Sequence, residues 1–175
     1  METPVTSSGI DELTGLNGRR RFFELAHTAF AEAHEAGAEC TAVVIDLDRL
    51  AYVNDNYGHH AGTELIRETG AAMAASADEN DIIGRLGGDE FALLRPGGVA
   101  SKEELWWQIS TAAKRAGRSD QPYGLAVSVG VAVARADEVA SLDELMARAD
   151  DAMYEHKQEG GGSEGPPHAR QQARD

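Results

Sequence analysis

A tight β-hairpin over residues 84–94 is the feature that most constrains how this chain can fold. Two short apolar runs, residues 82–83 and 91–94, are typical of strands and stand on either side of the Gly87-Gly88 pair. Glycine tolerates the positive φ that the favoured two-residue hairpin turns require. The sequence therefore predicts a hairpin whose tip is formed by Gly87 and Gly88.

Two carboxylates, Asp89 and Glu90, follow this tip directly. A tip without side chains lets a bulky polyanion approach the backbone, and adjacent carboxylates can hold the Mg²⁺ that such an anion carries. The alternative is an acidic turn that is merely solvated. The hairpin alone leaves both open, so the choice depends on the rest of the chain.

A second pair of carboxylates ends a predicted central strand. Residues 41–48 are β-branched and apolar as far as Asp46 and Asp48, which are two positions apart and therefore lie on one face of the strand. A carboxylate at the end of a buried strand is costly unless it is paired or bound to a metal. We therefore favour a chemical role for Asp46, whereas capping of the next helix and chemistry are equally open for Asp48.

The hydrophobic periodicity of the remaining chain predicts the fold class. Helices are expected over residues 19–36, 49–57, 60–77, 101–116 and 141–159, a strand over 124–134 and a turn over 54–58. Ser101 and Ser141 are expected to open capping boxes, and Trp106 to be more buried than Trp107. The order α-β-α-α-β-β-α-β-α predicts an α+β sandwich, in which helices flank an antiparallel sheet with the hairpin at its middle.

Charge and hydropathy narrow the class of partner and the compartment. The 175 residues suit one domain, and the formal charge of −14 argues against a nucleic acid polymer or an anionic membrane as partner. The N-terminus lacks the pattern of a signal peptide, and the single Cys40 cannot form an internal disulfide. We expect a cytoplasmic protein with a short lead (residues 1–10), one domain (11–160) and a disordered tail (161–175).

The carboxylates suggest a class of reaction. Asp46 and Glu90 end two different strands, which a sheet can bring together, and paired carboxylates around two Mg²⁺ ions suit in-line attack on a phosphate. The sequence contains no P-loop, no nucleophile elbow and no Cys/His cluster. The residues alone therefore suggest phosphoryl or nucleotidyl transfer.

Five short motifs in succession resemble one known family, the GGDEF-domain diguanylate cyclases, over roughly residues 11 to 160. The motifs are Asp11-x-Leu-Thr-Gly-Leu16, Asp46-Leu-Asp48, Asn54-Asp55-x-x-Gly58-His59-x-x-Gly62, Arg85-x-Gly-Gly-Asp-Glu-Phe91 and Ala149-Asp150-x-Ala-Met-Tyr154-x-x-Lys157. The resemblance implies a palm-like α+β domain that binds one GTP. In that family two subunits face each other, and each 3′-hydroxyl attacks the partner's α-phosphate to give cyclic di-GMP and pyrophosphate.

The resemblance also implies roles for residues of this chain. Asp46 and Glu90, with the Leu47 carbonyl, would hold Mg²⁺ or Mn²⁺, and Asp89 would help to deprotonate the attacking hydroxyl. The other implied contacts are all with the nucleotide. The backbone of Gly87 and Gly88 would let the nucleotide pass, and Asn54 would bind the base. The backbone amides of Arg49 and Leu50, together with the Lys157 side chain, would bind the phosphates.

The chain departs from the family's pattern at positions that bind the nucleotide. Ala51 replaces a usual lysine, residues 160–162 replace a phosphate-binding Gly-Arg-Asn, and Asp78 replaces the arginine of the inhibitory product site, of which Asp81 remains. Two interpretations therefore stand. One is an active cyclase with metal and base positions intact. The other is a degenerate module that binds nucleotide or docks to a protein without turnover.

Thr63 replaces a base-reading carboxylate of the family. A hydroxyl that can donate or accept would serve either purine, so one hypothesis is relaxed selection, with some ATP use and some cyclic GMP-AMP formed. The other is that Thr63 only packs against its helix. Since no sensory domain precedes Leu13 in this sequence, we expect any control to come from a separate protein, from dimerisation or from a missing partner region.

Overall fold

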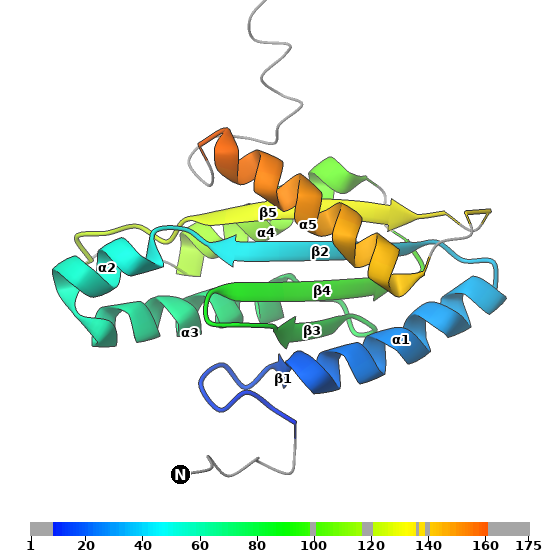
Figure 1. Cartoon of the computed structure of the whole chain (residues 1–175), viewed down its shortest axis with the longest axis horizontal. Helices are drawn as coiled ribbons and strands as arrows, with labels where there is room; N and C mark the ends of the chain where they lie inside the picture. Colours follow the sequence, from blue (N-terminus) through cyan, green and yellow to red (C-terminus); the bar gives the residue numbers. More distant parts are fainter. Residues whose placement is uncertain (1–8, 99–100, 117–120, 136, 139–140, 161–175) are drawn as a thin grey trace, which may run out of the picture.

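The computed structural model describes residues 9–98, 101–116, 121–135, 137–138 and 141–160 (Figure 1). Most of the predicted lead and all of the predicted tail lie outside these residues. The elements are β1 (Asn17–Gly18), α1 (Arg19–Glu35), β2 (Cys40–Leu47), α2 (Leu50–Tyr57), α3 (His59–Ser76), β3 (Ile82–Arg85), β4 (Glu90–Pro96), α4 (Lys102–Ala116), β5 (Val127–Ala134) and α5 (Leu142–Gln158). No helix in the described part is long and apolar enough to cross a membrane.

One five-stranded sheet in the order β1-β3-β4-β2-β5 forms the centre of the domain. The hairpin of β3 and β4 fills the second and third positions, and its pairing and that of β2 with β4 and β5 are antiparallel. The predicted antiparallel sheet is therefore confirmed for these four strands, whereas β1 was not predicted and pairs with β3 in parallel. Two residues are too few to show a periodicity. A side-chain hydrogen bond from Asn17 to the Ile83 carbonyl, 2.7 Å long, supports this pairing.

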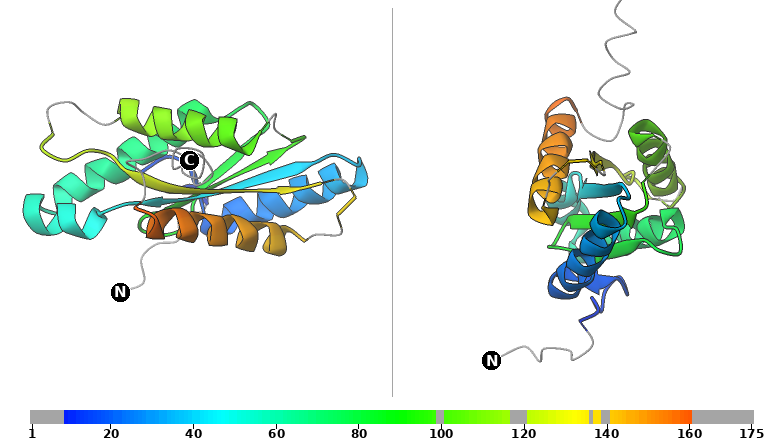
Figure 2. Two further views of the ribbon diagram at one scale, coloured as in Figure 1. Left: turned by 90° about the horizontal axis from the view of Figure 1, so that it is seen from above. Right: turned by 90° about the vertical axis from the view of Figure 1, so that its right-hand side faces the viewer.

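Helices cover both faces of the sheet. Figure 2 shows α1 and α5 on one face and α3 and α4 on the other. The alternation of side chains along each strand divides the core accordingly. Val127, Val129 and Val131 of β5 join the core under α3 and α4, whereas Ala132 and Ala134 join the core under α1 and α5. The sequence thus builds a three-layer α+β sandwich.

The small-residue face of β5 allows α5 to lie unusually close to the sheet. A Cβ atom on Gly130 would overlap the backbone of Ala149 and Met153. His156 fastens the same helix further along, since its buried ring accepts a 3.1 Å hydrogen bond at Nδ1 from the Val129 amide. These contacts fix the end of α5 that carries Lys157.

The predicted helix starts are largely confirmed. Ser101 and Ser141 each accept a hydrogen bond at Oγ from the amide three residues on, at 3.0 and 3.1 Å. Trp106 is 5% exposed and Trp107 is 49% exposed, as expected. The turn predicted over residues 54–58 is wrong, because α2 continues to Tyr57 and only Gly58, at φ 87°, separates it from α3.

Candidate active site

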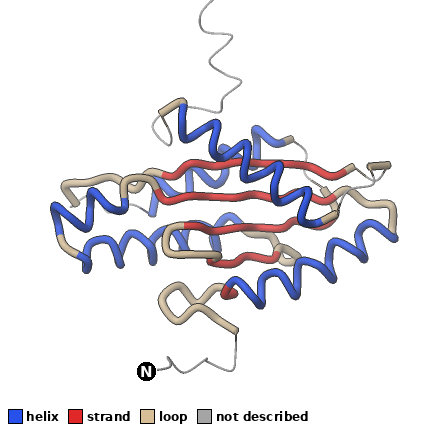
Figure 3. Tube along the Cα trace, viewed as in Figure 1, coloured by secondary structure: helices blue, strands red, loops and turns tan. Residues whose placement is uncertain are grey.

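The loop between β3 and β4 is wider than the predicted two-residue turn. Figure 3 shows it as the link between the two strands, and it comprises residues 86–89. The amides of Leu86 and Gly87 both donate to the Glu90 carbonyl, at 2.8 and 3.3 Å. Neither Gly87 nor Gly88 has a positive φ, so the predicted reason for glycine here is wrong. The wider loop turns the chain without left-handed residues.

The two glycines instead leave the outer surface of the loop bare. A Cβ atom on Gly88 would meet no heavy atom within 4 Å, and one on Gly87 would meet only Glu90 Cβ at 3.9 Å. The fold itself therefore has room for side chains at both positions. Their absence leaves the backbone open to a bulky ligand, as predicted for a polyanion.

Arg85 holds this loop in shape. Its Nε donates to the Gly87 carbonyl and its Nη2 to the Gly88 carbonyl, both at 3.0 Å, while Nη1 donates to Asp11 at 3.1 Å. Asp11 in turn accepts hydrogen bonds from the Thr14 amide at 3.0 Å and hydroxyl at 2.7 Å. The first predicted motif is thus tied to the loop through one guanidinium group.

The sheet brings the predicted carboxylates together at one end of the molecule. Asp46 and Glu90 are direct register partners in β2 and β4. The Leu47 amide donates to the Asp89 carbonyl at 2.8 Å, which ties the end of β2 to the loop. In Figure 1 this end, on the left, also carries α2. The strands therefore bring three acidic residues to one corner, as the sequence predicts.

Burial and neighbouring negative charges make the ionised form of these carboxylates less favourable. Burial raises the pKa of the Asp46 carboxyl, a hydrogen bond from Lys157 opposes this, and the charge of Asp89 adds to the rise. Burial and then the charge of Asp150 raise the pKa of the Glu90 carboxyl, against the opposing charge of Arg19. The corner therefore favours the arrival of positive charge.

The donor set fits a hard divalent cation. Asp46 Oδ1 is buried and has no hydrogen-bond partner among the described residues, so one ligand oxygen is available. Asp46, Glu90 and the Leu47 carbonyl offer only oxygen, which suits Mg²⁺ or Mn²⁺. Within the described ranges no three His, Cys, Asp or Glu side chains form a ready-made metal cluster. Water and phosphate oxygens would complete the coordination.

Asp48 does not cap α2, the first of the two roles considered for it, and its contacts lie across the sheet instead. Its Oδ1 accepts a 2.8 Å hydrogen bond from the Ser128 hydroxyl, and its amide donates to the Ala126 carbonyl at 2.9 Å. The residue that caps α2 is Arg49, and α2 has no side-chain cap. Asp48 therefore ties the end of β2 to the start of β5. Ser128 could not be linked to it from the sequence, because the two are 80 positions apart.

The N-terminus of α2 lies just beyond these carboxylates in the chain. Arg49 adopts the left-handed conformation at φ 64°, which is uncommon for a residue with a Cβ, and its guanidinium lies over the ring of Tyr52. The first amides of a helix have no partner within the helix, so those at Arg49 and Leu50 are suited to phosphate oxygens.

Asn54 of α2 and Thr63 of α3 are predicted base-reading residues, and the contact between their helices involves Gly62. The Asn54 side chain rests against Gly62, where any Cβ atom would overlap its amide oxygen. Thr63 follows Gly62, and its hydroxyl donates to the His59 carbonyl at 2.9 Å. This bond uses the only hydroxyl proton, so Thr63 presents lone pairs to a ligand.

Lys157 lies at this corner but contacts a predicted metal ligand. Its Nζ donates to Asp46 Oδ2 at 2.7 Å, whereas the predicted partner was a terminal phosphate. The hydrogen bond and charge of Asp46 raise the pKa of the Lys157 ammonium, so it stays charged.

Comparison with known proteins identifies the family of this chain. A family model described as "Diguanylate cyclase, GGDEF domain" matches residues 8–163. The chain belongs to the GGDEF family. Diguanylate cyclase DgcM of Escherichia coli K12 is 32% identical over 151 residues, and diguanylate cyclase DgcS of Shewanella oneidensis is 31% identical over 150 residues. Each match covers 86% of this chain, but only 36% of DgcM and 50% of DgcS.

Solved GGDEF structures confirm the fold class. The GGDEF domain of DgcB from Caulobacter crescentus, solved in complex with c-di-GMP, has a TM-score of 0.79 and 30% identity, with 89% of this chain and 93% of that chain covered. Diguanylate cyclase SiaD from Pseudomonas aeruginosa, solved with its activator SiaC, has a TM-score of 0.79 and 28% identity, with 89% and 60% covered. The predicted GGDEF-type α+β fold is therefore correct.

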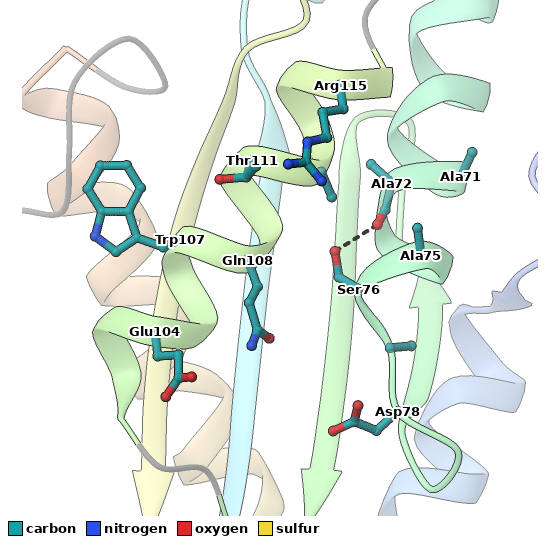
Figure 4. A pocket seen from close by; sticks show the side chains of 12 residues that line it. Ala71, Ala72, Ala75, Ser76, Asp78, Glu104, Trp107, Gln108, Thr111 and Arg115 are labelled. Carbon is teal, nitrogen blue, oxygen red and sulfur yellow. Dashed lines mark hydrogen bonds between the residues drawn. The ribbon is translucent and has the colours of Figure 1, made fainter.

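A broad groove of this GGDEF domain lies away from the carboxylates, between α3 and α4 (Figure 4). Its volume is about 900 Å³. Alanines of α3 line one side, where Ser76 donates to the Ala72 carbonyl, and Trp107 and Arg115 of α4 line the other. The groove lacks the clustered carboxylates of the β2–β4 corner, so the candidate site remains at that corner.

Two further residues of the GGDEF domain were not predicted to matter. Arg95 of β4 donates to Asp81 at 2.6 Å and lies 3.3 Å from Asp78, so it pairs with both acidic residues at the positions where the resemblance implies a product site. His156 was overlooked although it is three residues after Met153 and extends the buried stripe of α5. Helical spacing could have identified His156 as a buried residue of α5. The ion pairs of Arg95 depend on the register in which β3 pairs with β4, which the sequence does not show.

Proposed function

We propose that this GGDEF domain is a diguanylate cyclase, which condenses two GTP molecules into cyclic di-GMP with release of two pyrophosphates. The observation that carries this proposal is the pairing of Asp46 with Glu90 next to Asp89 of the β3–β4 loop, where Gly87 and Gly88 leave the backbone bare. Membership of the GGDEF family and the diguanylate cyclases among its relatives support the same reaction.

Each step makes and breaks one bond at phosphorus. The 3′-hydroxyl oxygen of one GTP bonds to the α-phosphorus of the other, the bond to the β-phosphate oxygen breaks, and pyrophosphate leaves with that oxygen. Asp89 accepts the hydroxyl proton. When bound, Mg²⁺ or Mn²⁺ supplies Lewis acidity toward the phosphate oxygens. Asp46, Glu90 and the Leu47 carbonyl would hold it.

The proposed nucleotide site extends from the carboxylates along α2. The Gly87 and Gly88 backbone lets the triphosphate pass, and the Arg49 and Leu50 amides bind phosphate oxygens. Since each domain binds one GTP and the product contains two, catalysis needs a homodimer with its sites face to face. Specific activity should therefore rise with protein concentration over a range around one micromolar.

Base recognition would fall to Asn54 and Thr63. Guanine presents donors at N1 and the 2-amino group, which match the lone pairs of Thr63, whereas adenine presents an acceptor at N1. The Thr63 hydrogen bond to His59 therefore favours guanine over adenine. A neutral hydroxyl discriminates less than a carboxylate, so ATP would be a weak second substrate and cyclic GMP-AMP a minor product.

The test is pyrophosphate release from GTP with Mg²⁺, with mass spectrometry of the nucleotide product. The wild-type domain should release pyrophosphate and form cyclic di-GMP. Glu90→Gln keeps the side-chain shape but removes a charge, and should abolish turnover while the melting temperature changes by less than about 5 °C. Glu35→Gln, at an exposed position at the end of α1, is the matched control. Full activity of Glu90→Gln would contradict the assignment.

A nucleotide-binding or docking module without turnover is the second candidate. The exposed Ala51 supports it, because a methyl group stands on α2 where a cation would strengthen phosphate binding. Losing charge-assisted contacts lowers affinity, whereas the carboxylates that perform the chemistry are in place. Binding of a GTP analogue without any pyrophosphate release from GTP would favour this candidate over the first.

A further inference from the structure

We propose that Lys157 is a built-in counter-cation of the metal site, which an arriving divalent cation displaces from Asp46 and thereby frees for the nucleotide phosphates. The inference rests on the proposed function, since it concerns the same carboxylates. It extends that function by giving Lys157 two successive partners and by coupling metal binding to nucleotide binding.

The geometry places an ammonium directly on a ligand oxygen. Lys157 Nζ lies 2.7 Å from Asp46 Oδ2, and the Asp46 side chain is only 17% exposed. The other oxygen, Oδ1, is buried and accepts no hydrogen bond within the described part of the chain. The ammonium therefore pairs with one of the two carboxylate oxygens, Oδ2, and leaves Oδ1 without a hydrogen bond from the described residues. A cation that binds Asp46 must take the remaining oxygen, displace Lys157, or do both.

The surrounding charges favour displacement. Asp46 interacts unfavourably with Asp48 and Asp89, and Lys157 brings one positive charge to this group. A divalent cation brings two charges and binds carboxylate oxygens directly. Once it is bound, the ammonium and the cation repel each other, so Lys157 gains from a new anionic partner.

The Lys157 side chain can move while its helix stays in place. The side chain is 44% exposed and has four rotatable bonds. The helix is fixed at the preceding residue by the bond from the Val129 amide to His156. The ammonium can therefore swing between Asp46 and a phosphate without any shift of α5.

The exchange makes metal and nucleotide binding cooperative. When metal binds alone, the displaced Lys157 ammonium gains only water as a partner, which weakens the binding of the metal. A nucleotide triphosphate offers the displaced ammonium an anionic partner, so each ligand strengthens the other, and the coupling is reciprocal.

The primary test is the affinity for Mn²⁺ alone, measured by calorimetry on the folded domain without nucleotide. Lys157→Met should bind Mn²⁺ about fivefold more tightly than wild type, the change that loss of one partly exposed ion pair allows. Arg19→Met is the matched control, because Arg19 acts on Glu90 through charge at a distance and lies over the Phe23 ring. It should change the affinity less than about twofold.

Chemical labelling gives a second readout. The chain contains three lysines, at positions 102, 114 and 157. Mn²⁺ without nucleotide should increase acetylation of Lys157, measured by peptide mass spectrometry, and leave that of the exposed Lys114 unchanged. Addition of a non-hydrolysable GTP analogue should then protect Lys157 again.

Two calorimetric results would overturn the inference alone: equal tightening in Lys157→Met and Arg19→Met, or Mn²⁺ binding in Lys157→Met that is unchanged or weaker. Unchanged labelling of Lys157 on Mn²⁺ addition would also overturn it. If the wild-type domain bound no Mn²⁺ even with the GTP analogue, both this inference and the proposed cyclase would be wrong. Lys157→Gln repeats the comparison with a polar side chain, should the methionine variant fold poorly.

Discussion

The Asn54 side-chain amide fills the space that a Cβ atom on Gly62 would occupy. The two residues belong to different helices, α2 and α3, and their contact sets the orientation of a proposed base-reading group. Gly62 has no side chain that could contact the base, so its effect on recognition would pass through Asn54.

Gly62→Ala should displace the Asn54 amide and weaken recognition of GTP. We expect KM for GTP to rise about tenfold and kcat to change less, since the carboxylates are untouched. Steady-state kinetics with a melting curve would measure this. Gly124→Ala is the control, because a Cβ there meets no atom within 4 Å and its φ is not positive. An unchanged KM in Gly62→Ala would contradict the role of the contact.

Asp11→Asn should lower stability in a pH-dependent way. Burial raises the pKa of the Asp11 carboxyl, but hydrogen bonds from Thr14 and the charge of Arg85 outweigh it, so the pKa is below its ordinary value of 3.8. The stabilisation is therefore present at neutral pH and is lost as pH falls through the folded-state pKa. The variant should lose about 1–2 kcal/mol at pH 7 and approach wild type near pH 3.

Urea denaturation at the two pH values would measure this difference. Glu12→Gln, at the exposed neighbouring position, should show no comparable change. A loss of the same size at pH 3 and pH 7 would show that the Asp11 charge contributes nothing to the fold.

Cyclic di-GMP should not inhibit this domain at the usual product site. Asp78 stands where the resemblance implies an arginine, and Arg95 is already paired with Asp81 and Asp78. A product phosphate would meet carboxylates there and be repelled. Pre-incubation with cyclic di-GMP should leave the initial rate unchanged, and Asp78→Arg should introduce inhibition. Strong non-competitive inhibition of the wild type would refute this.

Substitutions at Thr63 should shift the product ratio in opposite directions. In equimolar GTP and ATP, Thr63→Asp should form cyclic di-GMP alone, because the carboxylate accepts from guanine and repels adenine N1. Thr63→Val removes the acceptor at nearly constant volume and should increase the share of cyclic GMP-AMP above wild type. Mass spectrometry of the products would measure the shares. Cyclic di-GMP as the sole product of all three proteins would end this idea.

The sequence predicted those elements whose hydrophobic residues recur with a regular period. The valines of β5 alternate and the buried residues of α3 recur at helical spacing, so both elements were expected. The two-residue β1 carries no period, and its pairing depends on the distant Ile83 carbonyl. The turn at Gly87 and Gly88 was misassigned because glycine suits either positive φ or an open surface, and sequence does not separate the two.

The candidate site was predictable by residue and less so by contact. Asp46 and Glu90 were expected to meet because each lies at one end of a strand and the two strands can pair in a sheet. In the structure the two residues are register partners. Lys157 was expected near phosphate, but its bond to Asp46 depends on where α5 ends relative to β2, 111 positions away in the chain. The Ser128 bond to Asp48 was equally hidden, since it depends on how β5 pairs with β2.

The close contact of α5 with Gly130 limits how this helix can move. Backbone rests on backbone there, so α5 cannot slide along β5 without first lifting away from the sheet. Larger residues at this strand position would act as a wedge and raise the whole helix. The small residue at position 130 of β5 therefore sets how near α5 brings the Lys157 ammonium to its partners, although β5 contains neither Lys157 nor Asp46.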